Sequence, residues 1–210
     1  MSILAINPGS YYHLESLEGE RYAGYFDRLV RPEELGAIDL EQYNVVLVPC
    51  RTPADRVEPH IARLRAYLDQ GGTVVATGES NSELWLPGVK FTPQPTNFWW
   101  WLTPGADLGV RVAKPEHSLF GYLTEKDCTY HLHGWFEVPA GAEVLVVNES
   151  KQPILYVDEV TTGGRMVITS LDPFYHHGSH FMPATTRFLD GFLPWVRDVL
   201  DAGKLGKATQ

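Results

Sequence analysis

Cysteine, clustered basic residues and long apolar segments are all scarce in this chain of 210 residues. Two cysteines, Cys50 and Cys128, are too few for a disulfide scaffold and favour a reducing cytoplasm. The net charge of −9 argues against a nucleic acid or an anionic membrane as partner, because either needs a concentrated positive field. No apolar run is long enough to span a bilayer, and the opening MSILAINPGS lacks the features of a signal peptide. We therefore expect a cytoplasmic protein.

Internal repeats and interdomain linkers are also missing. A hydrophobic content of 44% and a charged content of 20% are typical of a globular domain with a substantial core. We expect one domain over residues 1–201, followed by a polar tail over residues 202–210.

The clearest structural pattern lies between Tyr43 and Ser80. Val45 to Val48 is a continuous apolar run, which is typical of a parallel strand covered on both faces. Apolar residues then recur at helical spacing from Ile61 to Leu68, and Gly71-Gly72 ends this helix. Residues 73–77 form a second β-branched run. The order strand, helix, strand predicts a βαβ unit with a right-handed crossover.

The flanking segments extend this unit into a mixed sheet. A short strand over residues 3–6 and another over 26–30 precede it, and residues 11–24 read as a loop with at most a short helix. Later strands are expected near residues 130–138, 144–148, 154–157 and 165–170, adding antiparallel strands at one edge. A helix over residues 183–200 closes the chain, and Pro194 is expected to bend or split it.

Histidines gather in two places that the fold could bring together. His131 and His133 alternate along a predicted strand and so share one face. Asp172, His176, His177 and His180 form the second group, in the loop that follows the last predicted strand at its carboxyl end. Imidazole and carboxylate groups suit a divalent transition metal such as zinc, acid–base catalysis, or mutual hydrogen bonding in a polar loop. The candidate metal ligands are His131, His133, His176 and His180, and the candidate catalytic residues are His176, His177, Glu79 and Asp172.

A run of aromatic residues, Phe98 to Trp101, lies in a proline-rich segment over residues 81–104. A single sheet face cannot bury four successive rings, because neighbouring side chains in a strand point to opposite faces. The run either covers the protein's own core or contacts a sugar or another subunit.

Several motifs resemble the class I glutamine amidotransferase-like superfamily, nearest to its ThuA-like and β-galactosidase-trimerisation branch. They are VVLVP, followed by a helix, DQGG and TVVATGES in the βαβ unit, EHSLFGYL at residues 116–123, and GGRMVITSLDPFYHHG at residues 163–178. The resemblance implies a flavodoxin-like three-layer αβα sandwich with a mostly parallel sheet.

The catalytic residues of that family are missing from the matching motifs of this sequence. Amidotransferases place a nucleophilic cysteine at a strand-to-helix elbow, whereas Gly78 stands at the matching position here. The family's later His-x-Glu pair is also broken, since His177 and Gly178 follow His176. Cys50 ends the preceding strand and Ser80 follows the elbow, and both are more typical of structural roles. Glutaminase chemistry by the family's route is therefore not expected.

Two functions remain open. The first is a non-catalytic module that binds a small polar ligand, with carbohydrate as one candidate, or mediates assembly. It needs no cofactor. The second is an enzyme of changed mechanism that acts on a sugar-like or other small substrate through residues 172–180, with a divalent metal as the alternative cofactor. A pocket in which His131, His176 and Glu79 converge around an ion would favour the second. We also expect a homo-oligomer. The candidate ligand-binding residues are Asn7, Cys50, Gly78, Ser80, Trp99, Trp100 and Trp101.

Overall fold

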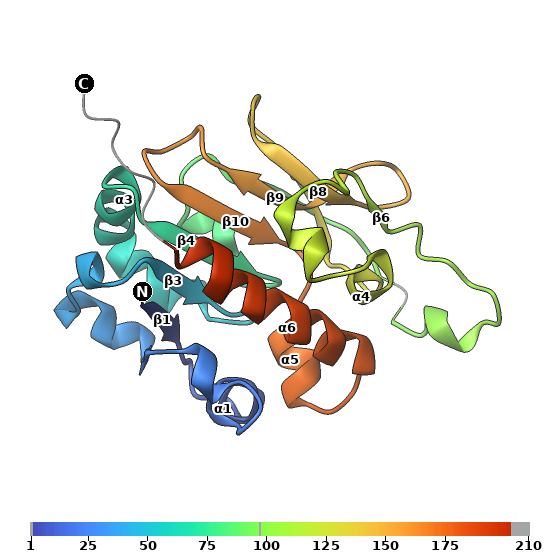
Figure 1. Ribbon diagram of the computed structural model, residues 1–210, viewed down its shortest axis with the longest axis horizontal. Helices are drawn as coiled ribbons and strands as arrows, with labels where there is room; N and C mark the ends of the chain where they lie inside the picture. Colours follow the sequence, from blue (N-terminus) through green and yellow to red (C-terminus); the bar gives the residue numbers. More distant parts are fainter. Residues whose placement is uncertain (1, 97, 203–210) are drawn as a thin grey trace.

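A computed structural model describes residues 2–96 and 98–202 and contains an eight-stranded mixed sheet (Figure 1). Five neighbouring strands are parallel, and the last three are antiparallel to their neighbours. This arrangement confirms the predicted mostly parallel sheet with antiparallel strands at one edge. In spatial order the strands are β2 (Arg28–Val30), β1 (Ile3–Ile6), β3 (Val45–Val48), β4 (Thr73–Thr77), β10 (Arg165–Thr169), β9 (Pro153–Asp158), β8 (Glu143–Val147) and β6 (Arg111–Val112).

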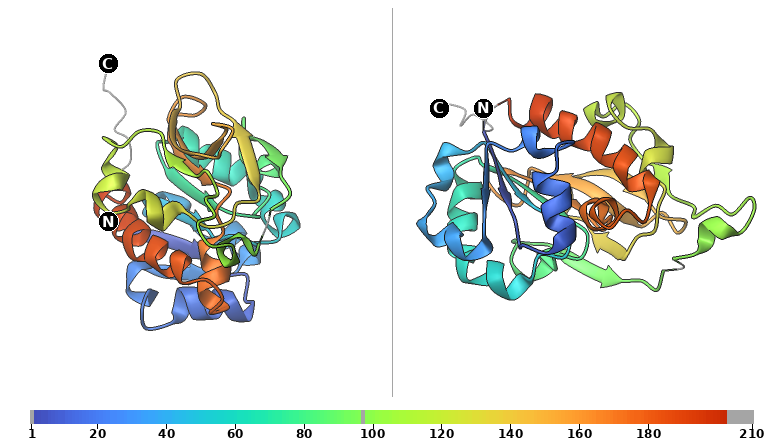
Figure 2. Two further views of the ribbon diagram at one scale, coloured as in Figure 1. Left: turned by 90° about the vertical axis from the view of Figure 1, so that its right-hand side faces the viewer. Right: turned by 90° about the horizontal axis from the view of Figure 1, so that it is seen from below.

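Helices cover both faces of the sheet, as the views in Figure 2 show. Successive residues of the central strands face opposite cores: Val45 and Leu47 lie in one, and Val46 and Val48 in the other. The first core receives α1 (Tyr11–Glu18), α5 (Pro173–Gly178) and α6 (Pro183–Trp195), and the second receives α3 (Ile61–Asp69). The three-layer αβα sandwich is therefore confirmed.

The remaining helical elements are short. They are α2 (Ala54–Val57), α4 (Glu125–Cys128) and 3-10 turns at Ala23–Tyr25, Pro32–Ala37, Leu40–Gln42, Glu58–His60, Ser82–Leu84, Trp100–Leu102 and Ser118–Gly121. Within the described residues, no helix has the length and apolar character needed to cross a membrane.

The expected strand over residues 130–138 differs from the observed one. Strand β7 (Gly134–Glu137) begins later and pairs with β5 (Lys90–Pro93) in a separate two-stranded sheet. Gly134 permits this pairing, because a Cβ atom there would collide with the carbonyl oxygen of Thr92. His131 and His133 consequently precede a strand instead of lying within one.

The last helix keeps an α-helical pattern through Pro194 and changes to a π-helical turn at Val196–Leu200. Pro194 has no N–H to donate to the helix. The hydrogen-bond pattern changes just after it, in place of the bend or split that was expected. Asp201 then accepts a hydrogen bond from the backbone N–H of Ser2 at 2.6 Å, which joins the two ends of the described chain. Of the expected tail over 202–210, residues 203–210 lie outside the described residues.

Candidate metal centre

The chain turns sharply after β4 at Gly78, the position that matches the amidotransferase nucleophile. Gly78 has a φ of +55° and donates its N–H to the carbonyl oxygen of Thr169 at 2.8 Å. A Cβ atom at Gly78 would lie 2.5 Å from Cβ of Cys50 and 2.6 Å from Cβ of Asp172. The elbow thus has no room for a cysteine side chain.

Four side chains converge beside this elbow, and we call them the His–Asp cluster: His131, His133, Asp172 and His176. Their ligand atoms all lie within 4.8 Å of one another. The Nε2 atoms of His131 and His176 are 2.5 Å apart. Oxygens of Asp172 lie 3.0 Å from Nε2 of His133, 3.3 Å from Nε2 of His176 and 3.6 Å from Nε2 of His131.

The sheet topology explains this convergence. Asp172 follows β10 at its carboxyl end and stands before the first residue of α5, so Asp172 and His176 are one helical turn apart. His131 and His133 alternate in the chain that leads into β7. The cluster therefore joins the carboxyl edge of the parallel strands, where ligands bind in open α/β sheets, to the neighbouring segment.

Burial and charge oppose each other in the cluster. Burial favours the neutral form of Asp172, but His133 and His176 outweigh it and hold the pKa of that carboxyl well below its usual value. Burial lowers the pKa of His131 to about 4, whereas the carboxylates of Asp172 and Glu79 overcome burial at His133 and raise its pKa. His131 is therefore a neutral imidazole at pH 7.

The carboxylate of Asp172 is fully buried, yet its contacts with the histidines are not aligned as hydrogen bonds. Among the described residues, neither of its oxygens has a hydrogen-bond donor, and Nε2 of His133 likewise has no hydrogen-bond partner. The short distance from His133 is thus an electrostatic contact. Buried polar atoms without partners are costly, so the cluster has unused capacity to bind a cation.

His177 and His180, which the sequence placed in the same site, lie elsewhere. Helix α5 turns His177 away from His176: its Nδ1 lies 2.8 Å from Oγ1 of Thr186, and its ring packs against Tyr22. His180 is exposed, with Nε2 3.8 Å from a carboxylate oxygen of Glu15. Residues 172–180 were expected to form a loop, but residues 173–178 form helix α5. The helix directs the neighbouring side chains of His176 and His177 to different sides.

Glu79 lies at the rim of the cluster. One oxygen is 3.3 Å from Nδ1 of His133, and the other is 2.9 Å from a guanidinium nitrogen of Arg51. The side chains of Glu79 and Arg51 are 41% and 32% exposed, so this rim is the part of the site in contact with solvent. Arg51 was not among the predicted site residues, although it directly follows Cys50 in the turn after β3.

Three other predicted ligand-binding residues, Asn7, Cys50 and Ser80, are buried. The side chain of Asn7 donates to Glu18 and accepts the N–H of Gly9, which fixes the turn after β1. The thiol of Cys50 is buried, and burial raises its pKa far above the usual value, so it is no reactive thiolate. Ser80 is buried, and its hydroxyl has no hydrogen-bond partner within residues 2–96 and 98–202.

Aromatic rings lie beside the cluster, and some of them come from residues 98–102, a turn followed by a 3-10 turn. We call this segment the aromatic arm; it projects from the body in Figure 1. The ring of Phe98 lies 4.7 Å from that of His131. Phe181 lies 5.8 Å from the ring of His176 and 5.6 Å from that of Trp99. Trp99 and Trp101 remain 54% and 50% exposed. The arm thus covers part of the site and also leaves aromatic surface in solvent.

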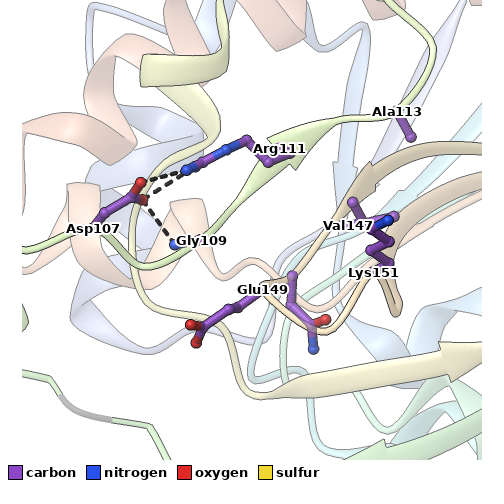
Figure 3. A pocket seen from close by; sticks show the side chains of 8 residues that line it. Asp107, Gly109, Arg111, Ala113, Val147, Glu149 and Lys151 are labelled. Carbon is purple, nitrogen blue, oxygen red and sulfur yellow. Dashed lines mark hydrogen bonds and ion pairs between the residues drawn. The ribbon is translucent and has the colours of Figure 1, made fainter.

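Several pockets lie outside the cluster, and two of them concern the aromatic arm and the strands β6 and β8. One of about 320 Å³ is lined by the arm and the start of α6, including Trp100, Trp101 and Phe181. The other, of about 500 Å³, lies beside β6 and β8 (Figure 3). Its charged residues are accessible, and Arg111 is paired with Asp107. The larger pocket contains no member of the His–Asp cluster and none of the predicted site residues.

No protein-family model matches the sequence, and no curated protein matches it. Solved structures do match. A ThuA-like protein from Bacteroides uniformis has a TM-score of 0.59 at 14% identity, over 97% of this chain and 93% of that one. A GMP synthase component from Thermoplasma acidophilum has a TM-score of 0.56 at 13% identity, over 95% and 97%. The chain therefore shares its fold with these two proteins.

A further match is a β-galactosidase from Rahnella sp. R3, with a TM-score of 0.53 at 13% identity. It covers 96% of this chain but 32% of the enzyme's own. The predicted resemblance to the ThuA-like and β-galactosidase branch is thus confirmed at the level of the fold.

Proposed function

We propose that the His–Asp cluster binds a divalent transition metal and that the protein is a metal-dependent enzyme acting on a small polar substrate. The observation that carries the proposal is the convergence of three imidazole nitrogens and a buried carboxylate within 4.8 Å. The glutaminase route is closed at Gly78, because the space for a nucleophilic side chain is filled by Cys50 and Asp172.

The donor set fits such an ion. Imidazole and carboxylate are the ligands that zinc and non-haem iron use in proteins. Four ligands at about 2.0 Å from a tetrahedral ion are roughly 3.3 Å apart. The distances from Asp172 to the three histidines, 3.0 to 3.6 Å, agree with this spacing. The 2.5 Å between His131 and His176 is shorter, so these two rings would separate on binding.

A bound ion would polarise an oxygen of the substrate or lower the pKa of a coordinated water. The chain's own contribution is positioning. Glu79 contacts His133 and is partly exposed, so it is placed to orient that ring and to accept a proton from a molecule at the rim. Phe98 and Phe181 cover the histidines and limit the access of water.

Elemental analysis of the purified, untagged protein tests this function. We expect about one equivalent of zinc or iron per chain, lost in His131→Ala and in His176→Ala, since each removes one of four ligands. His177→Ala is the matched control, because His177 neighbours His176 in α5 but bonds to Thr186. Absence of metal from the wild type, with no rise in melting temperature on adding divalent ions, would contradict the proposal.

A second candidate is a non-catalytic module in which the aromatic arm binds carbohydrate or another subunit. The exposed rings of Trp99 and Trp101 favour it, since such surfaces stack on sugars and occur at subunit interfaces. The Rahnella neighbour is a β-galactosidase, which gives galactosides as a first sugar to test. Because the rings of Trp99 and Trp101 are exposed, we also propose that the protein forms a homo-oligomer.

The double variant Trp99→Ala/Trp101→Ala tests this second candidate. If the arm binds galactosides, the wild type shows saturable quenching of tryptophan fluorescence with lactose, and the variant loses the binding measured by calorimetry. If the arm mediates assembly, light scattering shows an oligomer for the wild type and a monomer for the variant. Tyr11→Ala, which removes another exposed ring, serves as the control. A monomeric wild type without sugar binding would eliminate this candidate.

A further inference from the structure

Arg51 adopts an unusual conformation at the rim of the His–Asp cluster. Its φ of 59° places a non-glycine residue in the left-handed region, which is unfavourable for a residue with a side chain. Its guanidinium lies 3.7 Å above the centre of the Tyr175 ring, a stacking contact that fixes the plane of the group. Local strain that persists beside a candidate site suggests a functional reason for this placement.

The guanidinium is incompletely paired. One terminal nitrogen, Nη2, lies 2.9 Å from Glu79 and 3.7 Å from Asp172. The Nε atom is buried and has no hydrogen-bond partner in the described part of the chain. An arginine presents five N–H donors in a planar fork that suits the two oxygens of a carboxylate. Arg51 therefore retains donors for an additional anionic group, and its side chain is 32% exposed.

The charge at this rim depends on the metal. Without an ion, the carboxylates of Glu79 and Asp172 face only Arg51 and the imidazole of His133, whose pKa they raise. A divalent cation at the cluster would add two positive charges and make the rim net positive. Binding of an anion at Arg51 would then require the metal.

We propose that Arg51 binds the carboxylate of a small 2-hydroxy- or 2-oxo-acid whose adjacent oxygen is directed to the metal. This assignment rests on the metal site proposed above. It identifies the substrate of the proposed metal-dependent enzyme as a small 2-hydroxy- or 2-oxo-acid. The nitrogen of Arg51 is 3.7 Å from Asp172, itself a proposed ligand. A ligand that contacts both Arg51 and the metal would therefore carry its two oxygen groups close together, as on neighbouring carbon atoms. A neutral sugar would offer no negative charge to the guanidinium donors that Glu79 leaves unpaired.

Calorimetric titration of the zinc-loaded, full-length protein with glycolate tests the inference, with zinc content measured on each sample. We expect glycolate to bind the zinc-loaded wild type and not the metal-free protein. Glycolamide, the neutral analogue, should bind more weakly. Arg51→Gln should keep its zinc and lose about 10- to 100-fold in glycolate affinity, since a charge-assisted pair is lost.

Two further variants make the result decisive. Arg56→Gln removes an exposed arginine paired with Glu33 and should bind glycolate as the wild type does. Arg51→Lys keeps the charge but loses the fork, so it should bind glycolate several-fold more weakly, and it serves if Arg51→Gln does not fold. Equal glycolate affinity in the wild type and the Arg51 variants, with zinc present in all, would overturn the role of Arg51 and leave the metal site standing. A wild type that binds no zinc would overturn both.

Discussion

Replacement of Gly78 by alanine is expected to lower the free energy of unfolding by about 2 to 5 kcal/mol, combining overpacking with a strained left-handed backbone. The added Cβ would lie 2.5 Å from Cys50 and 2.6 Å from Asp172, closer than such atoms approach in proteins. Chemical denaturation of the wild type and the variant measures this difference. Gly78→Cys should be destabilised at least as much and should show no glutaminase activity.

Substitutions at two other glycines separate the cost of overpacking from the cost of the left-handed backbone. Gly105 has a φ of +74°, and a methyl group added there would meet nothing within 4 Å, so Gly105→Ala reports the backbone cost alone. Gly24 has open space and no such φ, so Gly24→Ala should be nearly neutral. A loss at Gly78 no larger than that at Gly105 would show that the elbow is not crowded. A reactive thiol with glutaminase activity in Gly78→Cys would contradict the account of this elbow.

Asp172→Asn is expected to weaken zinc binding by more than about 100-fold, whereas Glu79→Gln should weaken it by about 10- to 100-fold. Asp172 is the single carboxylate among the ligand atoms of the cluster, and an amide supplies no charge. Glu79 acts through His133, which it contacts at 3.3 Å, and so has a smaller effect. Competition with a chromogenic zinc chelator at pH 7.5 measures both affinities.

Asp158→Asn is the matched control for this series. Asp158 is buried like Asp172, but it accepts hydrogen bonds from Val160 and Thr161 in the turn after β9. Its replacement should reduce stability without changing zinc affinity. Equal zinc affinity in the wild type and Asp172→Asn would remove Asp172 from the ligand set.

The fold could be predicted because its central strands are continuous apolar runs. Val45 to Val48 and residues 73–77 are fully buried, as a parallel strand between two helical layers must be. The pairing of β7 with β5 could not be predicted, since β5 ends at Pro93 inside the proline-rich segment and periodicity does not specify a partner for β7. The short α5 was also missed, because six residues are too few to show a helical period.

The candidate site was only partly accessible from the sequence. His131 and His133 were grouped by their alternation, and Asp172 and His176 by their position after the last strand. Separating His176 from His177 required the helix that turns them to different faces. Arg51 was invisible for a different reason: its importance lies in a φ of 59° and a stack on Tyr175, a residue more than one hundred positions away.

X-ray absorption spectroscopy at the zinc edge of the reconstituted protein tests the central claim most directly. The account predicts a zinc ion with about three imidazole ligands and oxygen, and no sulfur, because the ligand atoms come from His131, His133, His176 and Asp172. His176→Ala should lose imidazole scattering, and His177→Ala should not. Sulfur ligation would place the ion at Cys50 or Cys128, and zinc with no imidazole ligand would show that the His–Asp cluster does not bind it.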